Sequence, residues 1–305
     1  MITLTLYRHC VLGVDVDVGV KSRRHRAKAK EYDGCCEDKS IHEYPYAIAV
    51  LMSPETMLNH AGFTRDMTYT LVTGGSKGIG YHIAKEFAKN GSDLILVARD
   101  NGPLSDAKHA LQEHDVTVQT LSQDLSQPSS AGDLVEYCDK QGWTVKTVVN
   151  NAGFGKQESF TETGLETHQS MLLLNCYTPL TLTHEYVNRG ADIINIGSVA
   201  GYQPLPGFAN YAATKAYVYS WSVALNQEVD ETVLTVCPGA TKTGFAERAG
   251  AGDLDEHGML PETVAKQIMD AYDSGDAVVI NGWRNKLLAA ASQLIPPSWI
   301  ARLIS

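Results

Sequence analysis

The chain of 305 residues lacks the long apolar run that a membrane-spanning helix requires. Such a helix takes about 20 consecutive apolar residues, and no uninterrupted run of about 18 occurs in this sequence. The first residues include Asp15 and Asp17 and contain no apolar segment of the kind that secretory signals carry. We therefore expect neither a spanning segment nor a cleaved leader.

Cysteine and histidine are too scattered to indicate a metal centre or a disulfide framework. The six cysteines have no metal-ligand spacing, and the ten histidines form no His-Glu-x-x-His motif. We predict that Cys138, Cys176 and Cys237 are small, unpaired core residues. The pattern suits a reducing cytoplasm, and we expect no bound metal.

Positive charge is scarce outside the first part of the chain. Residues 1–66 contain nine Lys/Arg and nine Asp/Glu, so the net charge of −10 belongs entirely to residues 67–305. This acidic part argues against nucleic acid as a substrate. The basic run 21–30 is compatible with a nucleic-acid or sorting role, but a solvated segment is the favoured interpretation. We expect a disordered extension over 1–66 and one folded domain over 67–305.

A glycine-rich turn is the most informative feature that the chain does contain. It follows an apolar run at 69–72 and opens a segment of helical periodicity, and it reads Thr73-Gly74-Gly75-Ser76-Lys77-Gly78-Ile79-Gly80. Glycines let a phosphate approach the backbone, and the free N–H groups at a helix start attract it. The pattern is weak by itself, and a turn without a ligand is the alternative.

The rest of the chain alternates between predicted strands and predicted helices. After 69–72, apolar and β-branched runs predict strands at 93–98, 116–121, 145–150, 191–197, 232–237 and 277–280. Helical stretches lie between them, at 79–90, 103–114, 129–141, 164–188, 209–228 and 261–274. This order predicts an α/β fold with a single doubly wound parallel sheet of Rossmann type, about seven strands, and helices on both faces. Ligands bind such sheets beyond the carboxyl ends of the strands.

Four polar residues are candidates for proton transfer at that edge. Tyr211 and Lys215 are four residues apart on a predicted helix, so they share one face. A nearby lysine cation lowers the pKa of a phenol from its ordinary value of about 10. Ser198 ends the fifth predicted strand, and Asn175 lies within a long apolar helix. A surface lysine, a turn serine and a structural amide are the alternatives for these residues.

Together these motifs resemble the compact branch of the short-chain dehydrogenase/reductase family. The resemblance rests on 73–80, Asp124, 150–153, Asn175, Ser198, Tyr211 with Lys215, and 238–239 with Thr243. It implies that Tyr211 exchanges a proton with the substrate oxygen while Ser198 hydrogen-bonds that oxygen. It also implies that Lys215 lowers the pKa of Tyr211 and holds the nicotinamide ribose, and that Asn175 holds a water linking Lys215 to solvent. The protein supplies placement and proton transfer, and the cofactor supplies the hydride.

The same resemblance implies a set of contacts with a nicotinamide dinucleotide. The glycines cradle the pyrophosphate, Asp124 and Leu125 meet the adenine, and 238–243 meets the carboxamide. The implied cofactor-binding residues are Gly74, Ser76, Lys77, Gly78, Ile79, Gly80, Arg99, Asp124, Leu125, Asn151, Ala152, Gly153, Tyr211, Lys215, Pro238, Gly239, Thr241 and Thr243. Thr241 departs from the family, which more often has Ile or Val there.

Two cations predict which dinucleotide binds. The second predicted strand ends in Ala98 followed by Arg99, where an acidic residue would bind both ribose hydroxyls, and Lys77 precedes Gly78. Arginine and lysine facing the ribose favour a 2′-phosphate through charge-assisted hydrogen bonds. We predict NADP, with NADPH as the reduced form; solvated surface charges are the alternative.

The predicted function is that of an NADPH-dependent oxidoreductase acting on a carbonyl/alcohol pair of a small molecule. The resemblance implies a cytoplasmic homodimer or homotetramer. Apolar residues predicted above Ser198 and Tyr211 favour a ketoacyl, steroid-like or aromatic carbonyl; they are Phe154, Tyr202, Pro204, Leu205, Pro206 and Phe208. A non-catalytic NADPH-binding sensor or scaffold is the alternative. An epimerase of the extended branch would need a larger segment after Pro238.

The last residues form an apolar tail whose role the sequence leaves open. Residues 286–304 are predicted to be helical on either side of Pro296 and Pro297. The tail can cap the substrate pocket, join a subunit interface or rest on a membrane surface. Packing in a core or an interface is the favoured interpretation.

Overall fold

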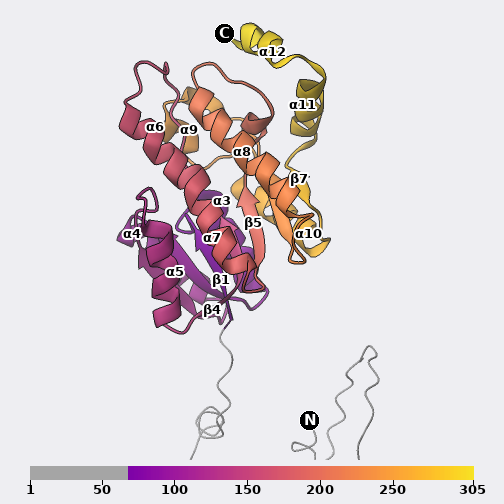
Figure 1. Cartoon of the computed structure of the whole chain (residues 1–305). Helices are drawn as coiled ribbons and strands as arrows, with labels where there is room; N and C mark the ends of the chain where they lie inside the picture. Colours follow the sequence, from indigo (N-terminus) through magenta and orange to yellow (C-terminus); the bar gives the residue numbers. More distant parts are fainter. Residues whose placement is uncertain (1–67) are drawn as a thin grey trace, which may run out of the picture. The chain divides into compact units, whose positions relative to one another are not determined.

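The structure, a computed structural model, describes residues 68–305, apart from the side chain of Asp253. The predicted extension 1–66 lies outside the described residues. The described part contains a seven-stranded sheet whose strands are all parallel (Figure 1). The strands are β1 (Thr68–Thr73), β2 (Asp93–Ala98), β3 (Val118–Ser122), β4 (Thr144–Asn150), β5 (Asp192–Ile196), β6 (Val233–Cys237) and β7 (Val278–Ile280). The predicted doubly wound fold is confirmed.

Helices join these strands and cover the two faces of the sheet. The longer ones are α3 (Gly78–Lys89), α4 (Asn101–Gln112), α5 (Ser130–Lys140), α6 (Leu165–Leu172), α7 (Thr178–Val187), α8 (Ala209–Leu225), α10 (Pro261–Asp273), α11 (Trp283–Leu294) and α12 (Pro297–Ile304). The short ones are the π-helical turn η1 (Leu173–Tyr177), the 3₁₀ turns η2 (Val199–Tyr202) and η3 (Gly252–Asp255), and α9 (Phe245–Ala249). None of the helices in the described range is both long enough and apolar enough to cross a bilayer.

The strand order β3-β2-β1-β4-β5-β6-β7 places a topological switch point between β1 and β4. The chain leaves β1 toward one side of the sheet and leaves β4 toward the other, so the loops after these two strands diverge and open a crevice. The glycine-rich turn follows β1, and the run Asn150-Asn151-Ala152-Gly153 begins at the end of β4. The switch point therefore brings the first two predicted ligand-binding motifs to one edge.

The core consists of two layers because successive strand residues point to opposite faces. Val72, Leu96, Val149, Ile194 and Val236 pack on one face against α3 and α10. The intervening strand residues pack on the other face with α5 and α7, and they include Leu71, Ile95, Val97, Val148, Ile193 and Val233. All of these side chains are fully buried or nearly so. The strands are therefore held from both sides, as the continuous apolar runs predict.

Two differences from the sequence-based boundaries have a clear physical cause. β3 begins at Val118, two residues later than expected. Asp115 turns the chain with a φ of 58°, and the Thr117 N–H bonds the Asp93 carboxylate at 2.7 Å, so the strand cannot begin earlier. The single helix predicted over 164–188 is three segments, because the π-helical turn η1 separates α6 from α7.

Candidate active site

The glycine-rich turn between β1 and α3 has no room for side chains at its key positions. Gly74 and Gly78 have φ values of 65° and 62°, which favour glycine. A Cβ on Gly74 would lie 2.7 Å from Nδ2 of Asn151, and one on Gly78 would lie 3.2 Å from Cβ of Thr243. Asn151 Nδ2 donates to the carbonyl oxygens of Thr73 at 2.9 Å and Gly74 at 3.1 Å. The loops after β1, β4 and β6 thus meet at this turn.

The start of α3 has the features of an anion site. Lys77 occupies the N-cap position and makes no side-chain cap, and no acidic residue lies in the first turn. The first N–H groups of a helix have no intrahelical partner, and the helix dipole favours negative charge there. Ser76, Ile79 and the exposed Lys77 lie at this turn. The residues present therefore fit a dinucleotide pyrophosphate.

The next two strand ends carry the predicted ribose and adenine contacts. Arg99 is exposed directly after β2, and its carbonyl oxygen accepts a 2.7 Å hydrogen bond from Ser122. Burial raises the pKa of Asp124, but hydrogen bonds from Ser126 and the charge of Arg99 outweigh that effect and leave the pKa lowered. Leu125 is buried in the core. Of the predicted adenine pair, Asp124 alone presents its side chain at the surface.

The structure brings all four predicted catalytic side chains together at the carboxyl edge of β5. Tyr211 and Lys215 lie on α8, with Lys215 Nζ 5.9 Å from the Tyr211 ring centroid. Ser198 follows β5 and hydrogen-bonds Tyr211. A Cβ on Gly153 would lie 3.0 Å from Asn175 Oδ1 and 3.5 Å from Lys215 Nζ, so Gly153 leaves open the space that these two groups border.

Asn175 reaches this site because of the π-helical turn η1. A π turn adds one residue to the helical repeat and so changes the face on which a side chain lies, and such turns often occur at functional sites. Asn175 is buried, and its Nδ2 donates to the Phe154 carbonyl at 2.9 Å and to Thr214 Oγ1 at 3.0 Å. Its Oδ1 accepts from the Phe154 N–H at 3.1 Å. The sequence reveals a polar residue in an apolar helix, but neither the π turn nor the role of Thr214.

Burial controls the protonation of the two titratable groups on α8. It raises the pKa of Tyr211 to about 12, with a partial offset from the hydrogen bond to Ser198. It lowers the pKa of Lys215 to about 8. Lys215 Nζ donates a 2.8 Å hydrogen bond to the carbonyl of Ile196 rather than to the phenol. The expected lowering of the Tyr211 pKa by Lys215 is therefore wrong for this structure, because desolvation is the dominant effect.

The loop after β6 lies between the predicted catalytic side chains and the glycine-rich turn. Thr241 Oγ1 donates to the Gly239 carbonyl at 3.0 Å, and Thr243 Oγ1 donates to the Thr241 carbonyl at 3.2 Å. The Pro238 carbonyl accepts from the Val199 N–H at 3.0 Å, just after Ser198. Asn285 of α11 packs so closely on Gly239 that a Cβ there would clash with its amide. No motif in the sequence points to Asn285.

Aromatic rings surround the phenol of Tyr211. Phe208 makes an edge contact with its ring at 5.3 Å, and Phe245 of α9 lies at 5.4 Å. Leu205 packs in the same cluster. Tyr202, predicted as another wall, instead pairs with Tyr219 at 4.6 Å. Phe245 follows the predicted Thr243 motif closely, but its approach to Tyr211 depends on the turn at Gly244, where φ is 68°.

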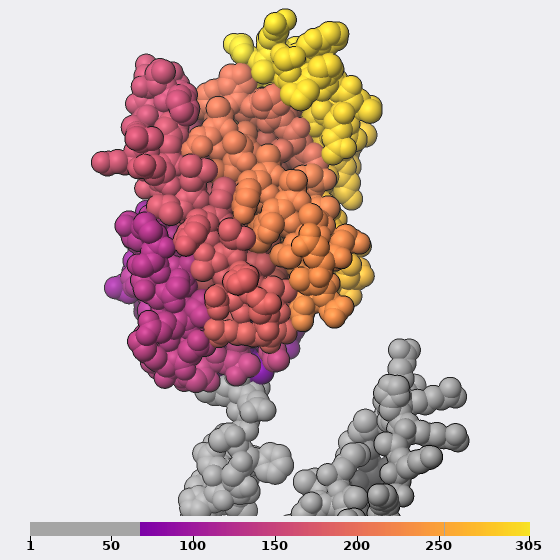
Figure 2. All heavy atoms as spheres, viewed as in Figure 1, coloured from indigo at the N-terminus to yellow at the C-terminus, as the bar shows by residue number. Residues whose placement is uncertain are grey.

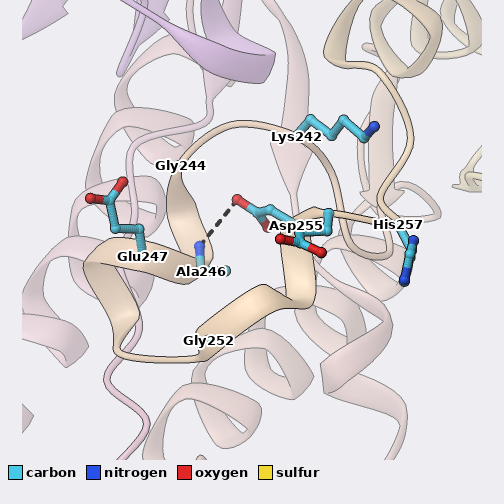
Figure 3. A pocket seen from close by; sticks show the side chains of 8 residues that line it. Lys242, Gly244, Ala246, Glu247, Gly252, Asp255 and His257 are labelled. Carbon is cyan, nitrogen blue, oxygen red and sulfur yellow. Dashed lines mark hydrogen bonds between the residues drawn. The ribbon is translucent and has the colours of Figure 1, made fainter.

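A polar cavity of about 590 Å³ opens beside this cluster, within the segment 242–257 (Figure 3). Its lining includes the charged or titratable side chains of Lys242, Glu247, Asp255, Glu256 and His257. The Ala246 N–H donates to the Asp255 carboxylate at 3.2 Å and so closes one side of the cavity. Within 68–305, no group of three His, Cys, Asp or Glu side chains is placed to bind a metal ion. The cavity is therefore polar space next to α9, without a metal-binding cluster.

Comparison with known proteins gives a consistent result. Residues 68–253 match the family model described as short chain dehydrogenase. The chain is 31% identical to sulfoacetaldehyde reductase 2 of Chromohalobacter salexigens, covering 67% of this chain and 84% of that protein. The residues matched by the family model lie within the described part of the chain.

Two solved structures share the fold over nearly their whole length. A short-chain dehydrogenase from Sphingobium yanoikuyae, solved in complex with NADPH, is 30% identical with a TM-score of 0.68, covering 74% of this chain and 94% of that one. The alcohol dehydrogenase of Comamonas testosteroni that is specific for bulky-bulky ketones is 28% identical with a TM-score of 0.64, covering 75% and 94%.

Proposed function

The chain belongs to the short-chain dehydrogenase family, and from that premise we propose that it is an NADPH-dependent reductase of apolar carbonyl compounds. It is an oxidoreductase acting on alcohol and carbonyl groups with a nicotinamide cofactor. The observation that carries the proposal is the convergence of Asn175, Ser198, Tyr211 and Lys215 beside the glycine-rich turn. A binding protein without catalysis has no chemical need for all four groups.

Tyr211 is the proposed proton donor for reduction of the carbonyl. When bound, the nicotinamide supplies the hydride that goes to the carbonyl carbon. Tyr211 gives its proton to the carbonyl oxygen as that oxygen gains charge, and Ser198 Oγ hydrogen-bonds the same oxygen. A pKa of about 12 keeps the phenol protonated at neutral pH, as an acid requires.

The proposed role of Lys215 is to return a proton to Tyr211 and to place the ribose of the nicotinamide. Asn175 supports Lys215 in this role. The pKa of Lys215, near 8, allows both its ammonium and its amine form close to neutral pH. Its Nζ lies in the buried space that Gly153 and Asn175 border, from which it can pass a proton toward Tyr211. Asn175 fixes the backbone of Phe154 at this point and so holds the loop on which the route depends.

NADPH is the proposed cofactor because two exposed cations lie where a 2′-phosphate would bind. Arg99 follows β2 and Lys77 is the N-cap of α3, and both side chains are exposed. The proposed cradle is the glycine-rich turn with 151–153, and 238–243 holds the nicotinamide end. Support also comes from the Sphingobium yanoikuyae dehydrogenase, which was solved with NADPH.

The proposed substrate is a carbonyl compound with a bulky apolar group. Leu205, Phe208 and Phe245 form an apolar cluster around Tyr211. Burying such surface contributes about 25 cal/mol per Å², so these rings favour an aromatic, steroid-like or ketoacyl group. The ketone specificity in the name of the Comamonas testosteroni enzyme supports the same class.

We also propose that the protein is a cytoplasmic homodimer or homotetramer. Leu172, Tyr177, Leu180 and Tyr217 are exposed on the layer formed by α6, η1, α7 and α8, which is more apolar surface than a single copy needs. The three described cysteines are free thiols, as a reducing compartment allows.

Oxidation of NADPH by the purified full chain tests the proposed function. We expect turnover with aryl ketones, steroid ketones or ketoacyl thioesters, and little turnover with acetaldehyde or glyoxylate. NADH in place of NADPH is the cofactor control. NADPH binding without turnover of any carbonyl in the panel would overturn the proposal in favour of a sensor.

A further inference from the structure

Helix α11 turns its large apolar side chains to solvent and places Asn285, Ala289 and Ser292 against the protein. Trp283, Leu287 and Leu294 are 67%, 62% and 86% exposed. Their spacing of four and seven residues puts them on one side of the helix. The opposite side carries Asn285, which packs on Gly239, and the buried Ser292, whose Oγ donates to the Ala289 carbonyl. An exposed apolar face of this kind marks a site of interaction.

Helix α12 extends the same apolar surface. Trp299 and Leu303 are one turn apart and 62% and 87% exposed, while Ile300 turns inward. The yellow segment at one end of the domain contains both helices (Figures 1 and 2). We call residues 283–304 the tail surface.

The charge of this segment is opposite to that of the chain. No Asp or Glu occurs after Asp276, whereas Arg284, Lys286 and Arg302 are all present and exposed. The tail surface therefore has a charge of +3, in a chain with a net charge of −10. A surface of leucine, tryptophan and basic residues without acids is complementary to an anionic partner with an apolar interior.

Tryptophan distinguishes this surface from the rest of the molecule. All four tryptophans lie within 68–305, and of these only Trp283 and Trp299 are exposed, whereas Trp143 and Trp221 are half-buried. Tryptophan prefers the boundary between lipid headgroups and acyl chains, where its ring is buried and its N–H remains solvated. The two exposed indoles stand at the beginning of α11 and near the beginning of α12, so both helices carry such an anchor.

We propose that the tail surface binds the face of an anionic phospholipid bilayer. A symmetric pairing of two tail surfaces would bring two groups of three cations together, whereas anionic headgroups neutralise them. The apolar stripe enters the headgroup region and the three cations bind lipid phosphates. Because α11 packs on η2 and Asn285 contacts Gly239, the bilayer lies near the edge of the sheet that carries Ser198.

Vesicle co-sedimentation of the full chain, without NADPH or carbonyl, tests this proposal independently of the reaction. The probes are neutral phosphatidylcholine vesicles and vesicles with about a third phosphatidylserine. Each cation near an anionic surface contributes about fivefold, so binding to the anionic vesicles should be roughly a hundredfold stronger. The combined variant Arg284→Gln, Lys286→Gln and Arg302→Gln should lose most of that difference.

The apolar stripe is tested with Leu287→Ser combined with Leu294→Ser, both at exposed positions. We expect vesicle binding to fall at least about tenfold, because two leucines no longer enter the lipid. Leu165→Ser on α6, at a position 70% exposed, is the matched control and should bind as the parent does. The basic run 21–30 is present in every variant, so differences between variants report on the tail surface.

Three results would overturn the proposal. The parent chain would fail to bind anionic vesicles, all variants would bind them equally, or the apolar-stripe variant would differ from the parent in oligomeric state. In the third case, the Leu287→Ser and Leu294→Ser variant would dissociate a dimer or tetramer in size-exclusion chromatography without vesicles. The surface would then be an interface between copies of the chain.

Discussion

Asn175 and Phe154 exchange two hydrogen bonds, one in each direction. The Asn175 amide nitrogen donates to the Phe154 carbonyl at 2.9 Å, and its oxygen accepts from the Phe154 N–H at 3.1 Å. One buried side chain thus replaces the strand partner that the backbone after β4 no longer has. The same amide nitrogen reaches Thr214 on α8, so the π turn, the β4 loop and the helix of Tyr211 form one unit.

Asn175→Ala should destabilise the protein and reduce turnover together. Two main-chain groups of Phe154 lose their partner, at a cost of about 2–4 kcal/mol in unfolding free energy. For a domain of this size, that corresponds to a fall of roughly 5–15 °C in Tm. Calorimetry and steady-state kinetics would measure the two effects. Asn188→Ala is the control. Among residues 68–305, the exposed Asn188 amide bonds only the His184 carbonyl, so the substitution should change stability by less than about 0.5 kcal/mol.

Tyr211→Phe should reduce kcat by at least about a hundredfold, the low end for general acid catalysis, and leave NADPH binding nearly intact. Phenylalanine keeps the contacts with Phe208 and Phe245 but has no proton to donate. Tyr217→Phe, at an exposed position on the same helix, should keep the parent rate. A Tyr211→Phe enzyme retaining more than about a tenth of the turnover would show that another group supplies the proton.

Hydrophobic periodicity was sufficient to predict the sheet because β1, β2, β5 and β6 are buried on both faces over almost their whole length. The motifs predicted which loops meet, since the carboxyl ends of parallel strands must share one edge. The π turn at Asn175 was not predictable, because it depends on the contacts with Phe154 and Thr214 rather than on local propensity. The raised pKa of Tyr211 was missed for a related reason: desolvation depends on how closely the rings pack, which no residue spacing reveals.

Lys215 should make the free energy of unfolding depend on pH, and replacing Lys215 should abolish that dependence. Burial lowers its pKa from the ordinary 10.5 to about 8, so between these values the unfolded chain binds more protons than the folded one. The free energy of unfolding therefore rises as the pH increases from about 8 to 10.5. Below pH 8 the folded protein carries the full cost of a buried ammonium group. Lys215→Met lacks this contribution.

Chemical denaturation at several pH values between about 7.5 and 9.5 measures this effect. The parent should gain stability relative to Lys215→Met as pH rises, and the variant should also lose turnover. Lys266→Met, at an exposed position on α10, controls for the loss of a lysine as such. Parallel curves for the parent and Lys215→Met would show that Lys215 keeps an ordinary pKa in the folded protein.

Arg99→Ala should raise the KM for NADPH roughly 10- to 150-fold and leave that for NADH almost unchanged. The reason is the loss of a charge-assisted contact with the 2′-phosphate, which NADH lacks. Lys77→Ala should act in the same direction, and Lys140→Ala, an exposed cation on α5, should affect neither cofactor. Equal effects of Arg99→Ala on both cofactors would instead mean that Arg99 shapes the loop after β2.

Gly78→Ala and Gly91→Ala separate phosphate binding from backbone strain. The two glycines have φ values of 62° and 78°, so an alanine at either position costs about 1–2 kcal/mol in folding free energy. At Gly91 the added methyl group meets nothing within 4 Å. At Gly78 it meets Thr243 at 3.2 Å and occupies the turn where the pyrophosphate is proposed to bind.

The two variants should therefore lose similar stability, while only Gly78→Ala loses NADPH affinity, by at least about tenfold in a fluorescence titration. Equal NADPH affinity in the two variants would mean that the dinucleotide binds away from this turn. Because both substitutions add the same methyl group at the same kind of backbone angle, a difference in affinity must come from the surroundings of Gly78, which include Thr243 at 3.2 Å, rather than from backbone strain.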